Sequence, residues 1–116
     1  IDTFNARAQV VKNAAIIKDI AIGKCPEDAK SPQLLAAQAA DSLIGIRGIN
    51  ASFVLCRADG RTIISGRSLG SINVQRILEK LGGGGHSTIA GAQLNCDMMN
   101  AALKLETAIH QYLKEK

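Results

Sequence analysis

Two apolar segments joined by Asp59 and Gly60 restrict the fold more than any other feature of this chain. Residues 51–57 form a largely apolar run that is typical of a strand buried on both faces. Aspartate before glycine suits the positive φ angles of a tight hairpin turn. Residues 61–67 are therefore expected to return as an antiparallel strand beside the first.

Helical patterns precede this hairpin. Asp2 or Thr3 can cap a first helix, and residues 18–24 are expected to form a strand. The apolar residues of that first helix recur at helical spacing: Phe4, Ala8, Val11 and Ala15. A second helix is expected from Ser31 to about Ile44, because the serine oxygen can accept an amide hydrogen bond and the proline that follows suits the first turn.

Two further helices are predicted after the hairpin. Asn73 can cap a helix that ends at Gly82, and Asp97 can cap the last one. The last helix has one apolar stripe: Met98, Ala101, Ala102, Leu105, Ile109 and Tyr112. Between them, residues 87–92 are expected to form a short helix and residues 93–96 a short strand. Interleaved helices and strands predict an α/β or α+β domain, in which helices cover one mixed sheet.

Composition is consistent with one soluble domain. The 116 residues are 47% hydrophobic and 21% charged, with a formal net charge of +4 that weakly favours anionic partners. Cys25, Cys56 and Cys96 lack C-x-x-C spacing and are expected to be free thiols in a reducing compartment, the cytoplasm. The chain begins with isoleucine, so we expect a piece of a longer protein, which can itself be membrane-anchored.

The most unusual segment is the four glycines at residues 82–85, followed by His86. Each glycine loses more backbone entropy on folding than any other residue, so a bound ligand would be a reason to order this segment. Successive amides can form a concave anion site, and the imidazole can donate a hydrogen bond to phosphate. The alternative is a helix C-cap followed by a mobile loop with a solvated histidine. The residues alone leave both interpretations open.

Arg67 lies at the predicted end of the second hairpin strand, next to Ser68. A guanidinium matches the oxygens of a phosphate, although a single arginine is more often an exposed, solubilising charge. Asn73 begins the helix that leads into the glycines. The strand end, the helix and the glycine segment can therefore converge on one side of the sheet.

The order of these motifs resembles the DHH-associated domain of DHH-family phosphoesterases, and within that family the bacterial cyclic-di-AMP phosphodiesterases. The resemblance rests on residues 64–68, 72–74, 82–86 and 90–91, and it extends to residues 38–41 and 49–55. Family members often have alanine where this chain has Gly66. We expect that difference to loosen the strand end and to leave Arg67 in place.

The resemblance implies that residues 1–116 form a substrate-binding domain that faces a cleft shared with a preceding catalytic DHH domain. The residues implicated in substrate binding are Arg67, Ser68, Asn73, Gly83, Gly84, Gly85 and His86. The catalytic domain would supply a divalent metal, usually manganese, and the nucleophilic water. His86 and His110 are the histidines of this chain and no Asp-His pair occurs, so we expect no metal site here and no hydrolysis by this piece alone.

Two other functions stay open from the sequence. One is a non-catalytic module that binds single-stranded nucleic acid, although such modules usually stack bases on aromatic side chains. Phe4, Phe53 and Tyr112 are all the aromatic residues, and each is expected in the core. The other is a domain that forms a homodimer through its apolar helices.

Overall fold

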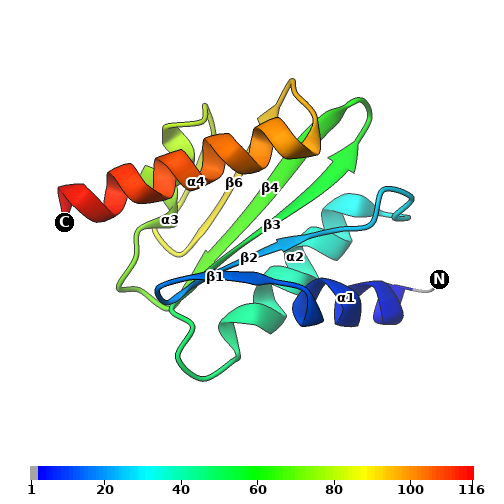
Figure 1. Cartoon of the computed structure of the whole chain (residues 1–116), viewed down its shortest axis with the longest axis horizontal. Coiled ribbons are helices and arrows are strands. Elements are labelled where there is room, and N and C mark those ends of the chain that lie inside the picture. The colour runs from blue at the N-terminus through cyan, green and yellow to red at the C-terminus, as the bar shows by residue number, and fades with distance from the viewer. Residues whose placement is uncertain (1–2) are drawn as a thin grey trace.

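The predicted hairpin forms the middle of a six-stranded sheet in the computed structural model, which describes residues 3–116 (Figure 1). The strands are β1 (Ala15–Ile17), β2 (Ile20–Lys24), β3 (Ala51–Ala58), β4 (Arg61–Ser68), β5 (Gly84–Gly85) and β6 (Ile89–Leu94). Their order across the sheet is β1-β2-β3-β4-β6-β5. β2 pairs with β3 in parallel, and the other pairs are antiparallel. The predicted mixed α/β sheet is confirmed.

The β3–β4 turn follows the expectation from the sequence. Ala58 pairs with Arg61, and the two residues between them have positive φ angles of 52° at Asp59 and 76° at Gly60. This is the backbone conformation that an aspartate-glycine pair tolerates best. The hairpin register fixes which residues of β4 lie on each face of the sheet.

Helices cover both faces of the sheet. They are α1 (Thr3–Lys12), α2 (Pro32–Ile44), α3 (Val74–Glu79) and α4 (Met98–Glu115). One buried cluster joins α1 and α2 to alternate residues of β2 and β3, and a second joins α3 and α4 to the intervening residues. Figure 1 shows α4 crossing the strands on one side and α2 on the other. Within the described part of the chain, this is a three-layer α/β/α arrangement.

Two of the three predicted helix caps that can be assessed are confirmed. The Asn73 side chain accepts a hydrogen bond from the Arg76 amide, and the Asp97 side chain accepts one from the Asn100 amide. The prediction that Ser31 caps α2 through its side chain is wrong. The Ser31 backbone is left-handed, with a φ of 48°, and the Ser31 side chain makes no capping hydrogen bond. Asp2 lies outside the described residues, as does the side chain of Thr3.

Local patterns misplaced several boundaries. Ala15 belongs to β1 and not to the first helix, and Lys18 has a φ of 53° in the turn before β2. The short helix predicted over residues 87–92 is wrong, because residues 89–94 form β6 between β4 and β5. Hydrogen bonding to two neighbouring strands outweighs the weak local preference of this segment.

Cys25 and Cys56 form a disulfide, which corrects the expectation that all three cysteines are free. The Cys25 amide donates a hydrogen bond of 2.8 Å to the Leu55 carbonyl and so extends the parallel pairing of β2 with β3. That pairing brings the two cysteine Cα atoms to 5.0 Å, although they are 31 residues apart in the sequence. Cys96 is free, as expected. None of the helices within residues 3–116 is long and apolar enough to cross a membrane.

Candidate phosphate-binding face

One face of the sheet is left open at β6 and β5, the two strands that follow the β3–β4 hairpin in the sheet order. Strand alternation places Ser65 and Arg67 of β4, and Ile89 and Gly91 of β6, on the face that α2 covers. The cluster under α1 and α2 ends at Ile63 of β4 and contains no residue of β6 or β5. The same face of β6 and β5 is therefore uncovered in the described structure.

A pocket of about 560 Å³ lies on this open face. It is lined by Gln33, Ile63, Ile64, Ser65, Gly82, Gly83, Gly84, Gly91, Ala92 and Gln93. The lining combines side-chain amides, one hydroxyl and the glycine backbone, and it contains no ionisable group. Such a surface offers hydrogen bonds to a ligand without fixing the ligand's charge.

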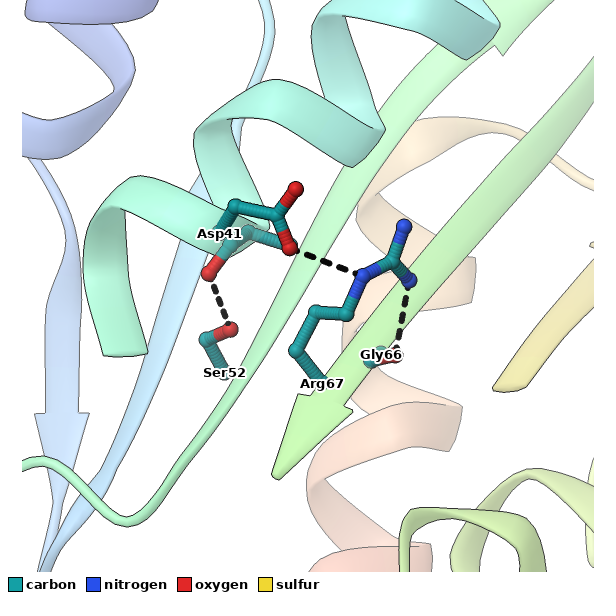
Figure 2. A network of polar contacts seen from close by, with 5 residues as sticks. Asp41, Ser52, Gly66 and Arg67 are labelled. Atoms are coloured by element: carbon teal, nitrogen blue, oxygen red, sulfur yellow. Dashed lines mark hydrogen bonds and ion pairs between the residues drawn. The ribbon is translucent and has the colours of Figure 1, made fainter. Parts of the chain in front are cut away.

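Arg67 lies on the same face of β4, two residues after Ser65. Figure 2 shows its side chain beside that of Asp41. Its Nε donates a hydrogen bond of 3.0 Å to the Asp41 carboxylate, and its Nη1 donates one of 2.9 Å to the Gly66 carbonyl. The side chain is only 15% exposed, so these contacts hold it close to the protein. Its Nη2 group has no partner among the described residues and can donate to a phosphate oxygen.

His86 lies near Arg67 across the sheet. Arg67 pairs with Ile89 of β6, and the His86 amide donates a hydrogen bond of 2.7 Å to the Ile89 carbonyl. The backbones of Arg67 and His86 are therefore two strand spacings apart, about 10 Å. The His86 side chain is exposed and makes no hydrogen bond or ion pair within residues 3–116. A ligand with two phosphates can span this separation.

Most of the glycine segment is ordered by the protein itself. The Gly82 amide donates to Glu79 and the Gly83 amide to Leu78, and Gly82 has a φ of 84°, so this part is a helix C-cap. Gly84 and Gly85 then form β5 and not a mobile loop. In the antiparallel ladder Gly85 falls between two hydrogen-bonded pairs, so its amide points outward from the sheet edge. Gly85 is therefore the glycine whose amide is best placed to meet a ligand.

Two of the predicted site residues have local structural roles. Ser68 is buried on the opposite face from Arg67, and its hydroxyl accepts a hydrogen bond from the Gly70 amide. The Asn73 side chain caps α3, and the Asn73 backbone amide donates a hydrogen bond to the Tyr112 hydroxyl. The structure places Arg67 on β4, two strands from the glycine segment and His86 at the β5 edge of the sheet, and it leaves Ser68 on the other face from Arg67.

Replacing Asn73 by alanine removes the acceptor for the Arg76 amide and is expected to lower the free energy of unfolding by about 1 kcal/mol. Asn73→Asp keeps the acceptor and is expected to stay within about 0.5 kcal/mol of the unchanged protein. Urea denaturation of the two variants checks this. Equal losses in both would show that capping is not what Asn73 contributes.

Sequence reasoning missed several residues of this face. Gln33 and Gln93 line the pocket, and Asp41 holds Arg67. Alternation along the second hairpin strand could have separated Arg67 from Ser68. No comparable signal in the sequence places residues of α2 over β4.

No group of three or more histidine, cysteine, aspartate or glutamate side chains that could hold a metal ion occurs among the described residues.

Comparison with protein families decides where the chain belongs. The model of the DHHA1 domain matches residues 13–115. The chain is a member of the DHHA1 family. Over 98% of its length it is 48% identical to the cyclic-di-AMP phosphodiesterase GdpP of Geobacillus thermodenitrificans and 44% identical to the cyclic-di-AMP phosphodiesterase PdeA of Listeria monocytogenes. This DHHA1 domain spans 18% of the length of each of those two relatives.

Solved structures share the fold of this DHHA1 domain at low sequence identity. An exopolyphosphatase-related protein from Bacteroides fragilis superimposes with a TM-score of 0.82 and 22% identity, covering 95% of this chain and 34% of that one. RecJ from Thermus thermophilus, in complex with Mn²⁺, gives a TM-score of 0.70 and 14% identity, over 97% of this chain and 16% of that one. The DHHA1 match and the identity to GdpP and PdeA confirm the resemblance in the sequence to DHH-family phosphoesterases.

Proposed function

We propose that this DHHA1 domain is the substrate-binding half of a cyclic-di-AMP phosphodiesterase. The observation that carries the proposal is the open sheet face, where Ser65 lines a pocket of about 560 Å³ and Arg67, two residues further along β4, lies on the same face with its Nη2 group unpaired among the described residues. The identity of 48% to one cyclic-di-AMP phosphodiesterase and 44% to another supports this choice of substrate.

In this proposal, charged contacts hold the phosphates and the uncharged pocket receives the nucleoside. Arg67 donates to one phosphate, while the Gly85 amide and the His86 imidazole lie at the place of the second. Gln33, Ser65 and Gln93 can donate to or accept from a base or ribose in the pocket.

The reaction itself is assigned to a DHH domain on the other side of the cleft. A divalent metal there, manganese in this proposal, supplies the activated water, and this domain holds the diester in line with it. Alone, half of a binding site should give weak affinity, with a dissociation constant on the order of 0.1–10 mM.

An NMR titration of this chain with cyclic di-adenylate tests the proposal. The amide signals of Gly84, Gly85 and His86 should shift saturably, and those of residues on α4 should not. Absence of any shift at these three positions at millimolar ligand would refute the assignment of this face.

Arg67→Ala is expected to weaken binding of cyclic di-adenylate by about tenfold or more, because a charge-assisted hydrogen bond is lost. Arg67→Lys should restore only part of this, since lysine keeps the charge but lacks the planar fork. The measurement is the dissociation constant from the same titration. Lys104→Ala, which removes an exposed positive charge from α4, is the matched control and should leave binding unchanged.

The nucleic-acid alternative predicts different behaviour in this experiment. Phe53 and Tyr112, the described aromatic side chains, are 0% and 7% exposed and cannot stack on bases. Oligonucleotide binding that falls steeply with salt, together with no response to cyclic di-adenylate, would favour that alternative.

A further inference from the structure

Asp41 is the carboxylate that meets the guanidinium of Arg67. Figure 2 shows the Asp41 side chain reaching from α2 toward the Nε of Arg67, at 3.0 Å. The Gly66 carbonyl accepts from Nη1 on another side of the same group. Two acceptors, one on Nε and one on Nη1, fix the plane of the guanidinium, and the outer N–H of Nη2, which points away from the Nε edge, stays available to a ligand.

The position of Asp41 is itself fixed by the sheet. Ser52 of β3 pairs directly with Arg67 of β4, and its hydroxyl donates a buried hydrogen bond of 2.7 Å to the Ala40 carbonyl. Ala40 immediately precedes Asp41 in α2. One pair of neighbouring strand residues therefore holds both partners of the ion pair, Arg67 directly and Asp41 through the helix (Figure 2).

The stability of the domain does not explain this carboxylate. Asp41 lies in the last turn of α2, where a negative charge opposes the helix dipole. Its side chain is 63% exposed, so solvent screens its ion pair with the less exposed Arg67 and keeps the contribution of the pair to stability modest. A residue that gains little for the fold, yet contacts the one arginine of the proposed site, points to a role in binding.

We propose that Asp41 is a positioning residue that orients Arg67 and makes the site discriminate against doubly charged phosphate groups. This proposal rests on the function proposed above and concerns the same arginine. A phosphodiester group carries one negative charge, whereas a terminal phosphate carries close to two at neutral pH. The Asp41 charge beside the guanidinium repels a negatively charged phosphate, and it repels a phosphate with two charges more strongly than one with a single charge. The site should thus favour the internal phosphates of a cyclic dinucleotide over the terminal phosphate of a cleaved one.

The size of the discrimination follows from Coulomb's law. A phosphate on Nη2 would lie roughly 7 Å from a carboxylate on Nε. At the high effective dielectric of a partly exposed site, one extra charge at that distance changes affinity by about three- to ninefold.

The experiment compares two ligands that differ in one charge, adenosine 5′-monophosphate and its methyl ester, by NMR titration of this chain at about pH 8. The variants are Asp41→Asn, which keeps an oxygen acceptor for Nε, and Asp41→Ala, which does not. Asp28→Asn, the same change at an exposed carboxylate in the loop before α2, is the control.

Asp41→Asn should shift the ratio of the two dissociation constants by about three- to ninefold in favour of the monophosphate. At about pH 5, where the monophosphate takes up a proton, this shift should vanish. Asp41→Ala should bind both ligands more weakly than Asp41→Asn, because the guanidinium loses its acceptor. Asp28→Asn should change nothing.

An unchanged ratio in Asp41→Asn would overturn the discrimination, and equal affinity in Asp41→Asn and Asp41→Ala would overturn the positioning role. Either of these results would overturn the role of Asp41 and leave the proposed function standing, provided that Arg67→Ala still weakens binding of the same ligands. If neither ligand shifts the signals of residues 84–86 in the unchanged protein, the proposed function fails first.

Discussion

Gly83→Ala is expected to lower the free energy of unfolding by about 2–3 kcal/mol, while Gly84→Ala is not. A Cβ atom at residue 83 would overlap the Gly91 carbonyl oxygen and lie 2.7 Å from the Ala92 Cβ. Gly91 and Ala92 belong to β6, where pairing with β4 prevents the backbone from yielding. A Cβ atom at Gly84 would meet nothing within 4 Å. Alanine there also restricts the unfolded chain, which can add about 0.4–1 kcal/mol of stability.

Alanine substitutions at these two adjacent glycines also distinguish an effect on stability from an effect on ligand binding. Gly84 lines the pocket, so its added methyl group should weaken binding of cyclic di-adenylate severalfold in a fully folded domain. Chemical denaturation and NMR titration of both variants are the measurements. Comparable stability losses in the two variants would contradict the packing seen at residue 83. Unimpaired ligand binding by Gly84→Ala would argue that the pocket is not used.

Phe53→Ala is expected to cost about 3–5 kcal/mol of unfolding free energy, which is a large part of the stability of a typical domain. Phe53 is fully buried in β3 beneath α3 and α4, and its ring lies against Gly66 of β4. Alanine would leave a cavity that the surrounding strands and helices cannot fill. Ile16→Ala, at a side chain that is 56% exposed on β1, should change stability by less than about 0.5 kcal/mol.

A second substitution tests the contact with Gly66 directly. A Cβ atom at residue 66 would lie 3.0 Å from the Phe53 ring and 3.3 Å from Leu78. Gly66→Ala should therefore be less favourable in the unchanged protein than in the Phe53→Ala variant, by about 0.5–3 kcal/mol. Additive effects would mean that Gly66 is not needed to accommodate the ring. The glycine provides space for Phe53, which the resemblance to the family did not indicate.

Features that depend on neighbouring residues could be predicted from the sequence. The β3–β4 hairpin follows from an apolar run and an aspartate-glycine turn, and the caps at Asn73 and Asp97 follow from short polar side chains before amphipathic stripes. The sequence predicts a helix over residues 87–92 and a strand only from residue 93, because small residues such as Ala90 and Gly91 have no strong local preference, whereas β6 begins at Ile89. Its strand conformation comes from hydrogen bonds to β4 and β5.

The candidate site was predictable only in part, for a related reason. The resemblance to a known family pointed to Arg67, His86 and the glycines, and strand pairing places these on or beside the neighbouring strands β4, β6 and β5. The contact of Asp41 with Arg67 and the disulfide between Cys25 and Cys56 join segments 26 and 31 residues apart. Neither follows from any local pattern, because both depend on which strands are neighbours.

The parallel pairing of β2 with β3 has a consequence for how binding activity arises during folding. The hairpin that contains Arg67 joins residues close in sequence, whereas the contact of Arg67 with Asp41 requires the longer β2–α2–β3 connection to be closed. Until then the arginine has no carboxylate beside it. A chain with only its local contacts formed would carry every residue of the site and still present a freely rotating guanidinium. The orientation of Arg67 in this domain therefore depends on a contact between segments 26 residues apart in the sequence.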